Sequence, residues 1–211
     1  MKTKVCGMKY RDNILSVASL QPDYLGFIFY QRSKRHFDGV LPELEPTIKK
    51  TGVFVNEELG TVSDTIIKYG LDAIQLHGDE SVDYCRALKK EVKAKIELIK
   101  AFSIAEDFNF DKLNPYDEVC DYFLFDTKGK ERGGNGTLFD WTLLNDYHHT
   151  KRFFLSGGIG LKEVAKLKQL LNSRAGRYCY AIDLNSKFES EPGLKKMEEL
   201  EEFFKQIEKH N

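Results

Sequence analysis

The sequence lacks the features that mark membrane or secreted proteins. No apolar run approaches the ~20 residues that a membrane-spanning helix needs, so we expect no membrane partner. The four cysteines form no Cys-x-x-Cys pair and are scattered along the chain, which favours a reduced, cytoplasmic protein. Residues 1–5 lead directly into a predicted strand, and we therefore expect no signal peptide.

An excess of charge of one sign is also absent. The 32 Lys and Arg residues are matched by 33 Asp and Glu residues, which leaves a formal net charge of -1. This balance argues against bulk electrostatic attraction to nucleic acid or to an anionic membrane. What the chain does have is a hydrophobic content of 41%, which supports a packed core. A length of 211 residues suits one domain, or at most two small ones.

Short apolar runs with little polar alternation recur along the chain, a pattern typical of strands buried on both faces. The predicted strands are Lys2–Val5, Tyr24–Phe29, Thr51–Val55, Leu71–His77, Glu97–Phe102, Tyr122–Asp126, Arg152–Ser156 and Tyr178–Asp183. Helical patterns separate most of them, and the last predicted helix runs from Leu194 to Ile207. Between the second and third strands, Pro42 and Pro46 allow only a short helix.

Strict alternation of strands and helices predicts a parallel sheet with the helices outside it. Eight units favour closure into an α/β fold of the (β/α)8 TIM-barrel type, with residues 1–211 as a single domain. An open doubly wound sheet is the alternative. No Gly-x-Gly-x-x-Gly motif follows the first strand, and the barrel is therefore preferred.

Polar residues and glycines follow the predicted strands, and in a barrel these strand ends meet at one rim. The candidate site residues are Cys6, Arg35, Asn56, His77, Asp126, Gly157, Gly158, Asp183, Asn185 and Ser186. Each also has a purely structural interpretation: a buried thiol, a hydrogen-bonded rim histidine, a loop-capping aspartate or a turn glycine.

The ends of the seventh and eighth strands are the usual phosphate position in this fold. Gly157-Gly158 and Asn185-Ser186 stand there, and glycine backbones let N–H groups approach phosphate oxygens. We therefore expect a small-molecule phosphorylated substrate. Arg35 offers a two-pronged guanidinium suited to a second anion, most simply a carboxylate.

Cys6 and Asp126 end the first and sixth strands, roughly across the barrel mouth from each other. A thiolate and a carboxylic acid can act together as base and acid on a bound substrate. No metal-ligand cluster or nucleotide motif accompanies them, and we expect neither a metal nor a cofactor. A thiolate at Cys6 needs a positive neighbour, for which Lys4, Lys9 and Arg35 are the candidates.

Taken together, these motifs resemble phosphoribosylanthranilate isomerases of tryptophan biosynthesis over essentially the whole chain. The resemblance is carried by Val5-Cys6-Gly7, Gly26-Phe27-x-Phe29, Ser33-Lys34-Arg35, Gly52–Asn56, Gln75–Gly78, Lys100–Phe102, Asp126, Gly133–Gly136, Phe139–Trp141, Leu155–Ile159, Asp183–Ser186 and Pro192-Gly193. Each motif is weak alone, but together in this order they are specific.

The resemblance implies a cofactor-free Amadori rearrangement of N-(5-phosphoribosyl)anthranilate. It implies that Asp126 is the general acid and Cys6 the general base. Arg35 would bind the anthranilate carboxylate, while Gly157-Gly158 and the loop from Asp183 to Ser186 would bind the phosphate. His77 completes the predicted substrate-binding set. The oligomeric state, monomer or homodimer, stays open at this point.

Two positions depart from the family pattern. Asn135 stands where Thr or Ser is more common, and Lys187 stands where many members have Gly. A lysine at Lys187 would be strained if that position requires a positive φ. The basic segment 127–136 is predicted to cover the substrate, with Lys128, Lys130 and Arg132 aiding its capture.

Other functions remain open at this point. A different sugar-phosphate isomerase or epimerase would usually need metal ligands or paired carboxylates at the strand ends, whereas an enzyme that also accepts a histidine-pathway aminoaldose would need room for a second phosphate. A barrel retained only for binding or regulation predicts loss of Cys6 or Asp126, and both are present.

Overall fold

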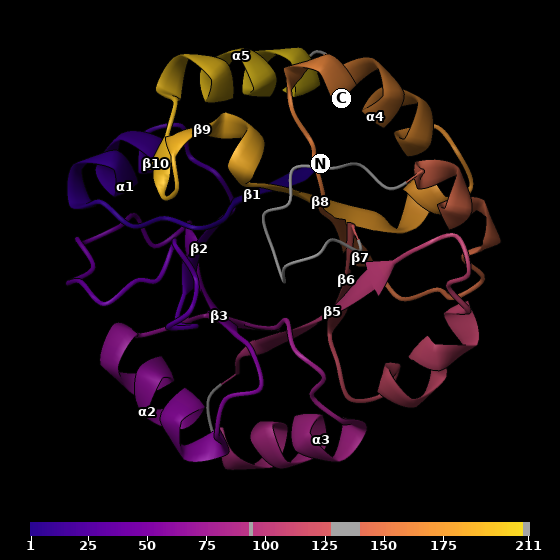
Figure 1. The fold of residues 1–211 in the computed structure, drawn as a ribbon, viewed down its shortest axis with the longest axis horizontal. Coiled ribbons are helices and arrows are strands. Elements are labelled where there is room, and N and C mark those ends of the chain that lie inside the picture. Colours follow the sequence, from indigo (N-terminus) through magenta and orange to yellow (C-terminus); the bar gives the residue numbers. More distant parts are fainter. Residues whose placement is uncertain (93–94, 128–139, 209–211) are drawn as a thin grey trace.

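A computed structural model describes residues 1–92, 95–127 and 140–208. Strands β1 to β8 form a closed, all-parallel barrel in chain order, with the helices outside (Figure 1). The strands are β1 (Lys2–Val5), β2 (Tyr24–Ile28), β3 (Lys49–Phe54), β4 (Ala73–Leu76), β5 (Glu97–Ile104), β6 (Tyr122–Thr127), β7 (Phe153–Leu155) and β8 (Cys179–Leu184). The predicted barrel is thereby confirmed.

Five α-helices lie among the described residues, each against the outside of the barrel (Figure 1). They are α1 (Arg11–Ala18), α2 (Leu59–Tyr69), α3 (Val82–Glu91), α4 (Val164–Leu171) and α5 (Met197–Glu208). Short 3-10 helices are η1 (Phe110–Tyr116), η2 (Trp141–Asp146), η3 (Leu161–Glu163), η4 (Ala175–Tyr178) and η5 (Ser186–Phe188). No described helix has both the length and the apolar character that crossing a bilayer requires.

Two predicted helices differ from the structure. The segment between β2 and β3 contains no helix at all, since Pro42 and Pro46 lack the N–H groups that a helix would use. The last helix begins at Met197 and not at Leu194. The residues before it instead form a small antiparallel hairpin, β9 (Glu189–Glu191) with β10 (Leu194–Lys195). Leu194 stands three residues before Met197, a helical spacing that concealed this hairpin in the sequence.

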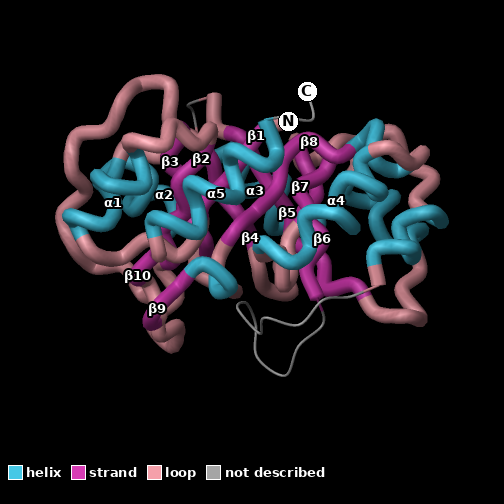
Figure 2. Tube along the Cα trace, turned by 90° about the horizontal axis from the view of Figure 1, so that it is seen from above, coloured by secondary structure: helices cyan, strands magenta, loops and turns pink. Residues whose placement is uncertain are grey.

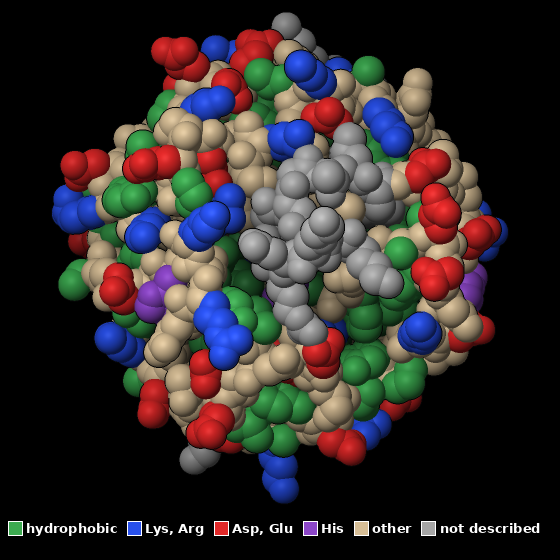
Figure 3. Space-filling view, viewed as in Figure 1, with side chains coloured by type: hydrophobic (Ala, Val, Ile, Leu, Met, Phe, Trp, Pro, Cys, Tyr) green, Lys and Arg blue, Asp and Glu red, His purple; other side chains and the backbone are tan. Residues whose placement is uncertain are grey.

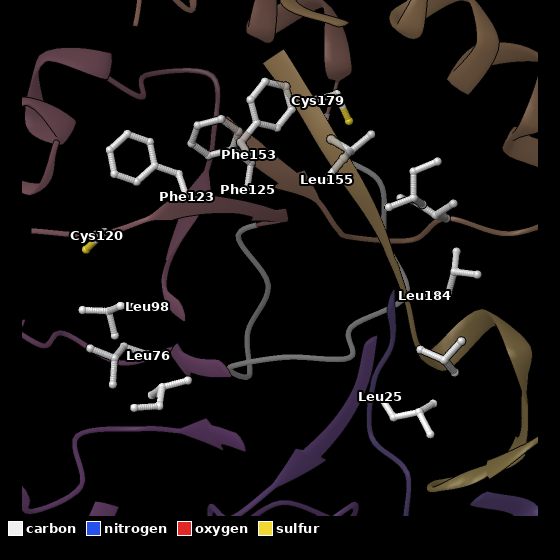
Figure 4. Close-up of a cluster of buried hydrophobic side chains, with 14 of the residues drawn as sticks. Leu25, Leu76, Leu98, Cys120, Phe123, Phe125, Phe153, Leu155, Cys179 and Leu184 are labelled. Atoms are coloured by element: carbon white, nitrogen blue, oxygen red, sulfur yellow. The ribbon is translucent and has the colours of Figure 1, made fainter. Parts of the chain in front are cut away.

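Buried apolar side chains form two layers. The larger layer lies between the barrel and its helices and includes Phe123, Phe125 and Phe153, which project from the outer face of the strands (Figure 4). A smaller cluster fills the barrel interior, and its members are Tyr24, Ala73, Ile99, Ala101, Leu124, Phe154 and Ala181. Because both faces are buried, the strands read as continuous apolar runs.

The alternation of side chains along each strand decides which residues point inward. Lys4 pairs in register with Asp183 on β8 and with Tyr24 on β2, and all three belong to the inner set. Cys6 lies two residues beyond Lys4 and therefore faces the same interior, at the carboxyl end of the strands. At this end lie β9 and β10, while the N-terminus lies at the opposite end (Figure 2).

Candidate active site

The structure brings all nine predicted catalytic and substrate-binding residues to one cavity at the carboxyl end of the barrel. These are Cys6, Arg35, His77, Asp126, Gly157, Gly158, Asp183, Asn185 and Ser186. The cavity contains about 780 Å³ of empty space, including its open mouth. On the face shown in Figure 3, Lys and Arg side chains are interspersed with Asp and Glu side chains.

Cys6 follows β1 directly and is 97% buried, with 3% of its surface exposed. Its backbone N–H donates to Leu184 O at 2.8 Å, which ties it to the end of β8. Gly26 on β2 makes room for the thiol, since a Cβ at that position would lie 2.7 Å from Cys6 Sγ. The thiol thus occupies a fixed position at the cavity floor.

Lys4 is the cation beside the thiol, among the three candidates that the sequence offered. Its Nζ donates to Asp183 Oδ1 at 2.9 Å, and both side chains are buried. Burial opposes its charge, but Asp183 and Cys6 keep the pKa of Lys4 above its ordinary value. Lys9 instead donates to Lys34 O at 3.4 Å.

The pKa of Cys6 lies above its ordinary value. Burial is the largest cause, Lys4 opposes it, and the carboxylate of Asp183 adds to it. The pKa of Asp183 is raised as well, because burial outweighs the contact with Lys4. The positive neighbour that the sequence analysis required is therefore present, but alone it does not make Cys6 a thiolate at neutral pH.

A chain of polar contacts joins β4 to the acid on β6. Gln75 Nε2 lies 2.8 Å from His77 Nδ1, and His77 Nε2 lies 3.3 Å from Asp126 Oδ2. If the Gln75 amide donates to Nδ1, the imidazole carries its proton on Nε2 and presents it to Asp126. The other oxygen, Asp126 Oδ1, accepts from the N–H of Thr127 at 2.8 Å. The carboxyl group is thus oriented on both sides.

The glycine pair after β7 adopts left-handed backbone conformations, with φ of 89° at Gly157 and 68° at Gly158. A Cβ on Gly157 would lie 2.8 Å from Thr127 N and 3.0 Å from Asp126 Oδ1. Glycine is therefore required at this position for steric as well as torsional reasons. It brings the backbone after β7 against the end of β6.

Arg35 reaches the cavity from the loop after β2, but part of its guanidinium is already engaged. Its Nε and Nη2 bind the carboxylate of Glu189, with an Nη2–Oε2 distance of 2.6 Å. Glu189 also accepts from Lys195 Nζ at 2.6 Å, and Lys195 in turn donates to Asn185 Oδ1 at 2.8 Å. A buried ionic network thus connects two of the predicted binding residues.

Several functional contacts were missed from the sequence. Gln75 could have been assigned to the site, because it lies two residues before His77 on a strand and so shares its face. The same spacing places Lys4, already a candidate, on the face of Cys6. Glu189 and Lys195 carried no such signal, since β10 was interpreted as the start of the last helix and β9 was not predicted as any element. The apolar residues Ile28, Tyr30, Val53 and Val55, which line one side of the cavity, were read only as strand or loop residues.

Two further predictions concern single positions. Lys187 lies in η5 and is not among the residues with positive φ, so it carries no such strain. Its side chain lines the cavity.

Asn56 does have a positive φ, of 50°, and its Oδ1 accepts from Asp79 N at 2.7 Å. Asn135, Lys128, Lys130, Arg132 and the rest of the predicted covering segment after Thr127 lie outside the described residues.

Comparison with known proteins identifies the family. Residues 3–206 match the family model described as N-(5'phosphoribosyl)anthranilate (PRA) isomerase. The chain is 43% identical to the N-(5'-phosphoribosyl)anthranilate isomerase of Parabacteroides distasonis, over 98% of this chain and 93% of that protein.

Solved structures agree with this match. A phosphoribosyl anthranilate isomerase in complex with reduced 1-(o-carboxyphenylamino)-1-deoxyribulose 5-phosphate is 28% identical, with a TM-score of 0.79 over 99% of both chains. Monomers generated from the dimeric enzyme of Thermotoga maritima are 25% identical, with a TM-score of 0.73 over 99% of this chain and 98% of that one. By fold, sequence and extent of the match, the chain belongs to the N-(5'-phosphoribosyl)anthranilate isomerase family.

Proposed function

We infer that this chain catalyses the Amadori rearrangement of N-(5'-phosphoribosyl)anthranilate to 1-(2-carboxyphenylamino)-1-deoxyribulose 5-phosphate, a step of tryptophan biosynthesis. Membership of the isomerase family supports this activity. One observation assigns the activity to particular residues: a buried thiol, Cys6, and an oriented carboxyl group, Asp126, line the same cavity.

Asp126 is proposed as the general acid. As a carboxylic acid it donates its proton to the ring oxygen of the furanose, the C1–O bond breaks, and the nitrogen lone pair forms an iminium. The contacts of Asp126 with His77 and with the N–H of Thr127 support this role, because they hold the carboxyl group in one orientation. The resulting carboxylate is stabilised by the same two donors.

Cys6 is proposed as the general base. Its thiolate removes the proton from C2 of the sugar, and the electron pair of the C–H bond neutralises the iminium to give an enolamine. Tautomerisation of the enolamine then gives the ketone. The neighbouring Lys4 supports this role, since its positive charge favours the thiolate over the thiol.

The two ends of the substrate have different requirements, and the cavity offers a different wall for each. Gly157, Gly158, Asn185 and Ser186, at the ends of β7 and β8, are proposed to bind the phosphate. Another part of the cavity lining combines apolar residues at the ends of β2 and β3 with Arg35. An aromatic ring that carries a carboxylate suits this combination, and we place anthranilate there.

We further propose that residues 1–211 form one domain that works in the cytoplasm, as a monomer or a homodimer. The dimeric Thermotoga maritima relative supports the dimer as one of the two options. The ring opening and the later steps of the reaction are driven by proton transfers, and Cys6 and Asp126 are proposed to supply these. We therefore propose no cofactor or metal.

The activity is tested by generating phosphoribosylanthranilate in situ and following the loss of its fluorescence. We expect turnover by the wild-type protein, and a fall of kcat by about 1000-fold or more in Cys6→Ser and Asp126→Asn. Cys179→Ser and Asp64→Asn are matched controls, since Cys179 lies in the outer core and Asp64 is exposed. A rate of fluorescence loss with the wild-type protein that does not exceed the background rate would reject the activity.

A further inference from the structure

The β9–β10 hairpin places a buried carboxylate against the arginine of the cavity. Arg35 Nε lies 3.0 and 2.9 Å from the two oxygens of Glu189, and Nη2 lies 2.6 Å from Oε2. The Glu189 side chain is 4% exposed and that of Arg35 is 14% exposed. A charged pair with this burial and two-pronged geometry is far more restrictive than an exposed ion pair.

The hairpin holds Glu189 independently of Arg35. Its Oε1 accepts from the N–H of Gly193, at 3.1 Å, and from Lys195 Nζ, at 2.6 Å. Lys195 is itself fixed by Asn13 of α1, which exchanges two hydrogen bonds with the Lys195 backbone at 2.8 and 2.9 Å. The hairpin lies beside α1 (Figure 1). Glu189 is therefore a rigid support against which Arg35 is placed.

This support leaves part of the arginine available to a ligand. A guanidinium has five N–H donors, and the contacts with Glu189 occupy its Nε edge. Among the described residues no other side chain bonds the remaining donors, and Arg35 lines the cavity. An arginine that is already ordered loses less conformational entropy when it binds an anion, so the support favours binding.

The charges around Glu189 also limit what the arginine can bind. Arg35 and Lys195 are two cations that share one carboxylate, and the cluster therefore keeps one excess positive charge. Burial lowers the pKa of Lys195, with Arg35 adding to this and Glu189 opposing it. One excess positive charge matches one ligand carboxylate.

We propose that Glu189 is a positioning residue that fixes Arg35 to recognise the carboxylate on the aromatic ring of the substrate. The inference rests on the proposed function, because that function supplies a substrate with such a carboxylate. It assigns a role to the β9–β10 hairpin: the hairpin sets the preference for carboxylated over uncarboxylated aromatic amines, without contact with the reacting atoms.

The test compares two substrates. Ribose 5-phosphate condenses with anthranilate or with aniline, with loss of water, to give N-glycosides that differ only in the carboxylate. Steady-state kinetics with both are measured for the wild type, Arg35→Met and Glu189→Gln, with product quantified by chromatography. Because Glu189→Gln leaves Lys195 buried without its carboxylate, the double variant with Lys195→Met is included. Glu199→Gln is the matched control, an acid-to-amide change at a partly exposed residue of α5 that pairs with Lys196.

In Glu189→Gln we expect KM for the anthranilate substrate to rise about tenfold or more, with kcat within about threefold and the aniline kinetics unchanged. Arg35→Met should lose the preference for the anthranilate substrate over the aniline substrate, and Glu199→Gln should retain this preference. A preference lost in Arg35→Met but retained in Glu189→Gln and the double variant overturns this inference alone. A preference retained in Arg35→Met overturns the assignment of Arg35 and this inference with it. A lower KM in Glu189→Gln would show that Glu189 competes with the substrate, and would also overturn it.

Discussion

Replacement of Lys4 by methionine tests how the buried thiol becomes a base. Lys4 contacts Cys6 and Asp183, and its side chain has no exposed surface. Two unit charges about 4 Å apart interact by about 4 kcal/mol at an effective dielectric constant of about 20. Since 1.36 kcal/mol corresponds to a factor of ten in a protonation equilibrium, loss of the cation disfavours the thiolate by roughly 1000-fold.

Asp183 makes the expected loss of thiolate smaller than this Coulomb estimate. Without Lys4 its buried carboxylate is unpaired and takes up a proton, which removes a negative charge that also disfavours the Cys6 thiolate. We therefore expect kcat of Lys4→Met at neutral pH to fall on the order of 100-fold, less than the full Coulomb figure. Methionine retains most of the buried volume of lysine, and circular dichroism should show that the fold persists.

The assay is the rate at which iodoacetamide alkylates Cys6, measured against pH by mass spectrometry. In the wild type the rate should still rise above pH 9.0, the ordinary pKa of a thiol, because burial raises the pKa of Cys6. In Lys4→Met the increase in alkylation rate should occur at a still higher pH, whereas the profile of Lys9→Met should match that of the wild type. The same alkylation profile in Lys4→Met and in the wild type would refute the reasoning.

Three further predictions concern stability and geometry. Gly157→Ala forces a Cβ against Thr127 and should lower kcat and cost about 1–3 kcal/mol of unfolding free energy, measured by urea denaturation. Glu80→Gln leaves Lys100 buried without its carboxylate, 3.2 Å away in the wild type, and should cost about 3–5 kcal/mol by the same assay; a cost below about 1 kcal/mol would contradict it. Although burial opposes it, Arg35 and Lys195 hold the pKa of Glu189 below its ordinary 4.5. The stability advantage of the wild type over Glu189→Gln should thus be complete above pH 4.5 and shrink as pH falls further, and an advantage that persists unchanged into acid would count against it.

Individual elements show which parts of the fold were readable in advance. Tyr122–Thr127 was recognised because a strand buried on both faces must be apolar at successive positions. Strand ends moved by one or two residues, as at Lys49, since pairing with the neighbouring strand and not hydrophobicity decides where a ladder starts. The β9–β10 hairpin was missed because short strands carry too few residues for a period to be visible.

By itself, the sequence determined the barrel, the family and the nine residues at its carboxyl rim, because strand order and alternation constrain which side chains can meet there. Only the tertiary structure decided which side chains touch one another. The pairing of Lys4 with Asp183, of His77 with Asp126 and of Arg35 with Glu189 joins residues far apart in the chain. Such contacts depend on barrel closure, register and burial, and these are properties of the packed molecule that no local pattern of residues contains.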